Sequence, residues 1–215
     1  MRPELPASYQ QILEFLERYG LLLLADARLP SVANLVVGEL LHRSWWGHPR
    51  GKEIYEIASR LAAHPQALMA KLVSGKETYV HARLWTALLG VGTAREPWQL
   101  RDLSPLASFL LETLARESVL RIDHMQSSTG LPGKALAQAA REVERRLLTY
   151  GESIHTASGA HVKQLESWER WMQRAGFTEQ PLAPEKGKRV LEDALLILNH
   201  QFDARGRLPW LATVL

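Results

Sequence analysis

The feature that most restricts the fold of this sequence is a change of hydrophobic period after Leu148. In the long segment before it, apolar residues recur every three or four positions, as on the buried face of a helix. Residues 149–155 and 161–166 instead alternate in polarity at every second position, as strands with one buried face do. The stretch between them, residues 156–160, is short and contains turn-forming residues. We therefore expect a β-hairpin that directly follows a helix.

Three helices are predicted ahead of this hairpin. Ser104 and Pro105 form a helix start, with Ser as the cap and Pro at the first helical position. A short helix is expected over residues 123–128 and a long one over residues 132–148. Helix, short helix, longer helix and hairpin, in this order, make a winged helix-turn-helix. We predict such a domain over residues 103–177, with the hairpin as its wing.

The remainder of the chain is predicted to be mainly helical, so the fold class is mainly α. Residues 1–95 form a predicted helical N-terminal domain, which ends at a polar stretch. Within it, Ser31 is a predicted N-cap, and Pro65 is expected to open a short helix that ends near Val73. The segment 185–215 carries a C-terminal helix that is expected to pack back on the body.

Composition limits the function classes. The chain has 215 residues, with 26 Lys and Arg against 23 Asp and Glu, for a net charge of +3. This mild excess permits an anionic partner without requiring one. The absence of cysteine excludes disulfides and thiolate metal sites. The histidines lack metal-ligand spacing, and no phosphate-binding glycine loop is present, so neither a metal nor a cofactor is predicted.

No apolar run approaches the roughly 18 residues that a membrane span requires. The first residues, Met1–Pro6, lack the basic-then-apolar layout of a signal peptide. We therefore expect no membrane partner and a cytoplasmic location.

A row of hydrogen-bond donors follows the outer face of the long predicted helix. Its members are spaced i, i+4, i+7 and i+11: Lys134, Gln138, Arg141 and Arg145. Such donors suit phosphates and the acceptor edges of guanine and adenine. The hairpin adds His155, His161 and Lys163. These seven residues are the predicted nucleic-acid-binding set, with DNA as the partner; an ordinary solvated helix face is the alternative, because Glu142 and Glu144 lie close by.

Two further groups are candidates for chemistry in the first half. Trp45, Trp46 and His48 lie together in a loop and could wall a pocket or stack on an unpaired base, or the rings could simply pack in the core. Asp26 follows a buried apolar segment and could act as a catalytic base, or it could cap a turn or pair with Arg28.

Parts of the sequence resemble a known family. The stretches 15–24, Leu29-Pro30-Ser31 and 71–80, followed by the predicted winged helix, are similar to winged-helix proteins related to bacterial DNA glycosylases that act on alkylated or crosslinked DNA. The resemblance implies a DNA-directed, repair-related protein. In the active enzymes of that superfamily a glutamine-rich motif activates water; the corresponding residues 23–26 contain no glutamine, which leaves Asp26 as the only candidate for that role.

Three functions follow as hypotheses. The first is a DNA-binding winged-helix protein of a repair-related, glycosylase-like family, without catalysis. The second is a DNA glycosylase that excises a damaged base. The third is a protein-interaction module or transcriptional regulator. The sequence leaves open whether the protein is an enzyme and whether it forms a homodimer.

Overall fold

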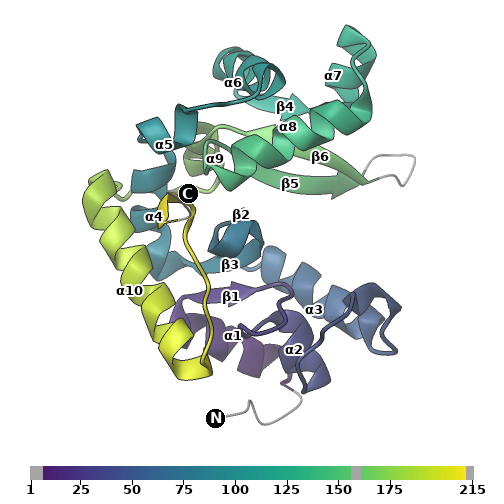
Figure 1. The fold of residues 1–215 in the computed structure, drawn as a ribbon, viewed down its shortest axis with the longest axis vertical. Helices are drawn as coiled ribbons and strands as arrows, with labels where there is room; N and C mark the ends of the chain where they lie inside the picture. The colour runs from purple at the N-terminus through teal and green to yellow at the C-terminus, as the bar shows by residue number, and fades with distance from the viewer. Residues whose placement is uncertain (1–6, 156–160, 212–215) are drawn as a thin grey trace. The chain divides into compact units, whose positions relative to one another are not determined.

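Residues 7–155 and 161–211 are described in the computed structural model, and the chain divides into two units. The first unit comprises Met1–Leu88 and Glu185–Leu215, and the second comprises Leu89–Pro184 (Figure 1). Ten α-helices and six strands form within the described residues, which confirms the mainly helical fold class. The strands make two small antiparallel sheets of three strands each, and the first of them lies in the N-terminal part that was predicted as a helical domain.

Local signals determine how the first unit begins. Ser8 caps α1 (Tyr9–Tyr19) by accepting a hydrogen bond from the Gln11 N–H, and Gly20 ends the helix with a φ of 78°. A Cβ on Gly20 would lie 2.7 Å from Leu84 Cδ1, so glycine also allows β1 (Leu21–Leu23) to start at once. Ser31 caps α2 (Val32–Val37), as predicted.

The first sheet has the strand order β1-β3-β2. The central strand β3 (Glu77–His81) pairs with β1 in the register Leu22↔Tyr79 and with β2 (Ala67–Lys71) in the register Met69↔Tyr79. The short helix expected after Pro65 is therefore wrong, because this segment is strand β2. Ala, Leu, Met and Lys are good helix formers, and pairing with β3 overrides that preference.

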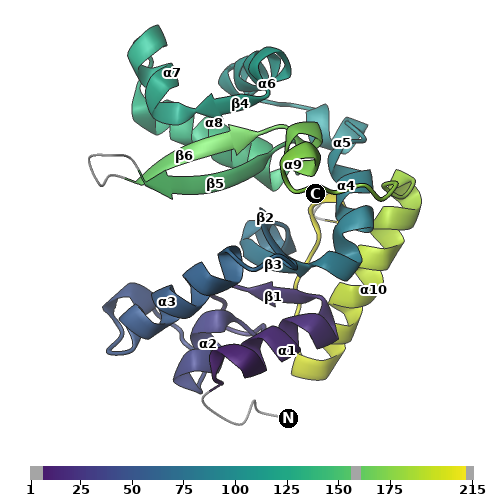
Figure 2. The same cartoon turned by 180° about the vertical axis from the view of Figure 1, so that it is seen from behind.

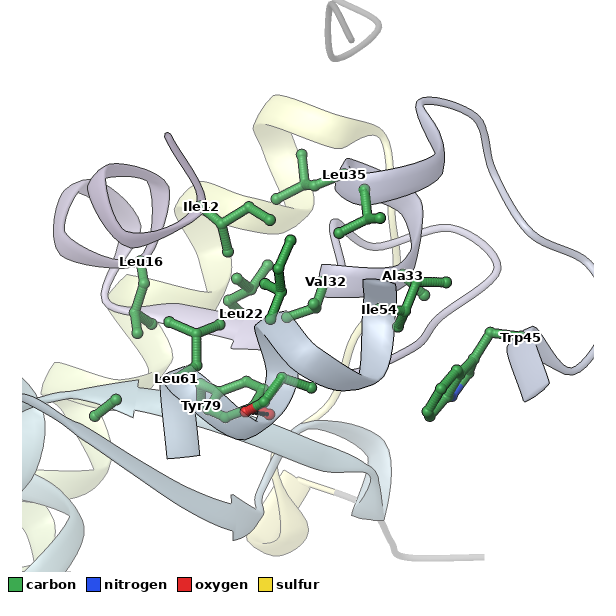
Figure 3. Packing of buried hydrophobic residues seen from close by; sticks show 14 residues of the cluster. Ile12, Leu16, Leu22, Val32, Ala33, Leu35, Trp45, Ile54, Leu61 and Tyr79 are labelled. Atoms are coloured by element: carbon green, nitrogen blue, oxygen red, sulfur yellow. Dashed lines mark hydrogen bonds between the residues drawn. The ribbon is translucent and has the colours of Figure 1, made fainter. Parts of the chain in front are cut away.

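Helices complete the first unit. Figure 1 shows α1, α2 and α3 (Gly51–Ala62) on one side of the sheet and α10 (Pro184–Phe202) beside one end of its strands. One hydrophobic cluster of this unit combines residues of α1, α2, α3 and all three strands (Figure 3). Leu191, Leu195 and Leu198 of α10 are buried as well. Within the cluster, the Tyr79 hydroxyl donates a 2.9 Å hydrogen bond to the Ala58 carbonyl. Burial raises the pKa of this tyrosine above its ordinary value.

The second unit starts with the rest of α4 (Trp85–Gly92), then α5 (Pro97–Leu100) and α6 (Pro105–Glu117). The predicted cap is present, because the Ser104 side chain accepts from the Ala107 N–H. Strand β4 (Val119–Arg121), which was not predicted, leads into α7 (Ile122–Thr129) and α8 (Gly133–Arg145).

A hairpin of β5 (Tyr150–His155) and β6 (His161–Glu166) follows α8, and α9 (Trp168–Arg174) comes last. The sheet order is β4-β6-β5, and all neighbours are antiparallel. In Figure 1 helix α8 lies in front of the hairpin, and in Figure 2 the hairpin lies in front of α8, so the helix covers one face of the sheet. The expected hairpin loop, residues 156–160, lies outside the described residues.

The two faces of α8 allow a matched stability test. Leu136 is fully buried in the core of the second unit, whereas Gln138 on the same helix is exposed. Leu136→Ala should lower the free energy of unfolding by about 2–5 kcal/mol because it removes buried methyl groups and leaves a cavity. Gln138→Ala should change it by less than about 0.5 kcal/mol. Urea denaturation followed by circular dichroism checks both, and equal effects would contradict the assignment of the two faces.

Candidate nucleic-acid interface

The core of the second unit sets the orientation of α8. Leu136, Ala139, Ala140 and Val143 are buried with residues of α6, α7 and β6. A helix that buries this stripe must turn the opposite stripe to solvent.

The opposite stripe carries the predicted donors. Lys134, Gln138, Arg141 and Arg145 are all exposed. Among the described residues, none of these four side chains makes a hydrogen bond or an ion pair. The structure thus brings the four together as one row of polar groups whose hydrogen-bonding capacity is unused.

The acidic residues of α8 are turned toward the protein. Glu142 accepts hydrogen bonds from the backbone N–H and the hydroxyl of Ser104, at 3.0 and 2.7 Å, and lies 3.7 Å from Arg146. The Glu144 side chain is only 5% exposed and lies 3.0 Å from the Lys163 ammonium group. Both carboxylates therefore have partners within the protein, and in the described part of the chain neither is bonded to a member of the exposed stripe.

Arg146 shows a structural role that sequence reasoning missed. Its guanidinium group donates to the backbone carbonyls of Gln99, Arg101 and Asp102 at the end of α5, while Gln99 donates back to the Arg146 carbonyl. These groups are 44–47 positions apart in the chain, so no local pattern points to the contact.

The hairpin residues have different surroundings. His155 and His161 are partners in the strand register, and His161 is exposed; the His155 side chain lies outside the described part. The Lys163 side chain is committed to Glu144 and is 24% exposed. Glycine at position 151 makes room for this pair, since a Cβ there would lie 2.3 Å from Glu144 Oε1. The Lys163 side chain thus forms an ion pair within the unit, whereas the four side chains of the row on α8 form none among the described residues.

Asp26 has a fully occupied carboxylate. One oxygen accepts hydrogen bonds from the backbone N–H groups of Arg28 and Leu29, both at 2.8 Å, and the other lies 2.6 Å from Lys76 Nζ. This is the turn-capping alternative, with Lys76 in place of the Arg28 side chain as the ionic partner.

The electrostatics of Asp26 agree with this geometry. Burial acts to raise the pKa of its carboxyl group, but the hydrogen bonds from Lys76 and from the two amides outweigh burial, so the pKa lies below its ordinary value. A carboxylate with a lowered pKa and both oxygens engaged is a poor proton acceptor.

The two tryptophans differ sharply in burial. Trp45, which lies at the edge of the core cluster in Figure 3, is 8% exposed. Trp46 is 69% exposed. Their rings are stacked with centroids 4.1 Å apart and planes 22° from parallel. His48 Nδ1 accepts a 3.1 Å hydrogen bond from the Arg50 N–H and is thereby part of the turn. The core alternative thus holds for Trp45 and not for Trp46.

A pocket that the sequence did not reveal lies in the second unit. It has a volume of about 300 Å³. Its polar lining comes from Thr93, Arg95, Ser118, Ser167 and Glu169. These residues come from three separate places in the chain, namely the segment after α4, the end of α6 and the start of α9, so no spacing rule joins them.

The described residues offer neither a metal centre nor a membrane-spanning helix. No group of three or more histidine or acidic side chains is placed to hold a metal ion there. No helix in that part of the chain is long and apolar enough to cross a membrane.

The comparisons with known proteins gave no match: no family model, no curated protein and no solved structure is significantly similar to this chain. The resemblance to the glycosylase-related proteins stays a prediction.

Asp26 gives a prediction about stability and pH. Asp26→Asn should lower the free energy of unfolding by about 1–2 kcal/mol near neutral pH, because the charge-assisted contacts are lost. The folded-state pKa is below the ordinary 3.8, so this stabilisation is present above 3.8 and disappears as the pH falls through the folded value. The difference between wild type and variant should therefore shrink in acid, as measured by urea denaturation at several pH values.

Arg28→Ala is the control, since the Arg28 side chain is exposed and only its backbone N–H reaches Asp26. A difference between wild type and Asp26→Asn that persists unchanged in strong acid would contradict the ionic role of Asp26.

Proposed function

We propose that the second unit is a winged-helix module that binds double-stranded DNA through the exposed face of α8. The single observation that carries the proposal is the row of Lys134, Gln138, Arg141 and Arg145, exposed and unpaired among the described residues while the carboxylates of the same helix are paired internally. The element order α6-β4-α7-α8-β5-β6 and the sheet order β4-β6-β5 support the winged-helix assignment.

The dimensions of the row fit a major groove. From Lys134 to Arg145 the helix rises about 16 Å, since each residue adds about 1.5 Å. That rise matches about five base pairs at 3.4 Å each. Arginine suits both a phosphate and guanine O6 and N7, glutamine suits adenine, and lysine suits a phosphate. The row therefore combines groups that position the helix on the backbone with groups that distinguish bases.

In this proposal the hairpin of β5 and β6 is the wing. His161 is exposed at the start of β6, next to the loop that joins the strands. A contact between this end of the hairpin and the DNA backbone would add affinity without sequence preference.

Base excision is not favoured by the geometry. Both oxygens of Asp26 are bound within the protein, and its pKa is lowered rather than raised. The assignment to a repair-related family rests on the sequence resemblance alone. We therefore propose DNA binding as the function and assign no catalytic residue.

The test is binding of a fluorescently labelled DNA duplex at several salt concentrations. Three cations that each neutralise a phosphate give a slope of log K against log salt of about −2.7, which is a loss of about 40-fold between about 50 and 200 mM salt. The double variant Arg141→Ala/Arg145→Ala should bind at least about tenfold more weakly at low salt, with a slope near about −0.9.

A matched control removes the same charge from another exposed helix. Lys186→Ala/Arg189→Ala on α10 should bind the duplex as wild type does, because both residues lie in the first unit. Affinity that does not change with salt, or an Arg141→Ala/Arg145→Ala protein that binds as tightly as wild type, would overturn the proposal.

A further inference from the structure

The first unit carries an aromatic surface that the proposed function does not use. Trp46 is the most exposed large apolar side chain among the described residues, at 69%, and Tyr55 beside it is 38% exposed. Their ring centroids are 6.0 Å apart, with planes inclined by 40°. Because one face of Trp46 is stacked on Trp45, an exposed fraction this high leaves its other face in solvent.

The protein holds this ring in a fixed place. Trp45 is buried under it, and the Trp45 carbonyl accepts a 3.0 Å hydrogen bond from the His48 N–H. The Gly51 N–H in turn donates to the His48 carbonyl at 2.8 Å, which joins the loop to the start of α3. A Cβ on Gly51 would lie 3.0 Å from the Trp45 carbonyl oxygen, so glycine allows this close approach.

Arg50 anchors the same turn from the other side. Its guanidinium group donates to the Val36 carbonyl at the end of α2 and forms a double hydrogen bond with Glu53, each at 2.7 Å. The loop between α2 and α3 is thus tied to both helices. A platform that is already ordered loses little conformational entropy when a ligand binds.

The charges around the platform fit an anionic strand. The acidic side chains on α3 are each paired with a cation: Glu53 with Arg50, and Glu56 with Lys52 at 3.7 Å. Arg43 is exposed and forms no ion pair within the described residues. Residues 39–60 contain four Lys and Arg against three Glu, a net charge of +1. This part of the chain therefore does not repel a strand of phosphates, but it attracts one only weakly. Affinity at this site must then come from stacking.

We propose that Trp46, supported by Trp45 and flanked by Tyr55, is a stacking platform for an unpaired nucleobase. Stacking on an aromatic face is tolerant of sequence, because every base presents a π-face. This inference rests on the proposed function in that nucleic acid is the partner, and it adds a second contact of a different kind: α8 recognises a duplex, and the platform binds an unpaired base. It assigns no chemistry to that base.

The experiment compares two strands of equal charge: a labelled oligothymidine and a strand of the same length with abasic sugars throughout. Wild type should bind the oligothymidine about tenfold more tightly, since the two probes carry the same phosphates and differ in the presence of the bases that stack. Because stacking involves no ion release, this ratio should not change with salt. Trp46→Ala should reduce the ratio to about one, and Trp46→Phe should keep part of it.

Controls separate this inference from the proposed function. Leu196→Ala removes an aliphatic side chain of similar exposure, 66%, from α10 and should leave the ratio unchanged. Arg141→Ala/Arg145→Ala should weaken duplex binding yet keep the base preference, so either proposal can fail alone. Thermal melting of Trp46→Ala near that of wild type excludes loss of folding.

Equal affinity of wild type for the two strands would overturn the inference, as would a Trp46→Ala protein that keeps the preference. Binding of a proline-rich peptide that depends on Trp46, without any base preference, would assign the platform to a protein partner and overturn it as well.

Discussion

The hydrogen bonds that hold Glu142 and Glu144 inside the second unit determine what α8 can present to solvent. Glu142 is bound to Ser104 at the start of α6, and Glu144 is bound to Lys163 on β6. These contacts hold one end of α8 to both of its neighbours and engage both carboxylates within the unit. Of the two, Glu144 forms the nearly buried ion pair, with a side chain 5% exposed, and removing one partner of a buried ion pair costs about 3–5 kcal/mol. The positive row on α8 is thus a consequence of how the interior is paired.

The first unit depends on a different arrangement, in which one central strand organises its surroundings. Strand β3 pairs with both β1 and β2, and its Tyr79 reaches the backbone of α3. Lys76, just before β3, is bound to Asp26 just after β1, so the ionic contact joins the two ends of neighbouring strands. A residue that the sequence suggests as a catalytic base is here part of the contacts that join two neighbouring strands. Trp46 is exposed and is not part of the core of this unit, although its stacking partner Trp45 is.

Local signals in the sequence predicted much of the fold. Ser31 and Ser104 cap the helices that they were expected to cap, and the change of period after Leu148 marks the start of the hairpin. Where long-range pairing decides, local reasoning failed: residues 67–71 have helix-forming side chains and become a strand only because β3 lies beside them. Strand β4 is three residues long, too short to show a period, and was missed for that reason.

The candidate site divides in the same way. The row on α8 could be predicted, because a helical stripe is a property of one segment. The ion pair between Lys163 and Glu144 could not be predicted, since the two residues meet only when the hairpin folds back on the helix. Asp26 shows the same limit, as its partner Lys76 is 50 positions away.

Mapping the contact of a DNA duplex on the protein by amide chemical-shift changes in NMR tests the central claim most directly. The account predicts that the largest shifts fall on α8, at and around Lys134, Gln138, Arg141 and Arg145, with smaller ones at the start of β6. Shifts concentrated on α6 or α10, with α8 unaffected, would contradict it.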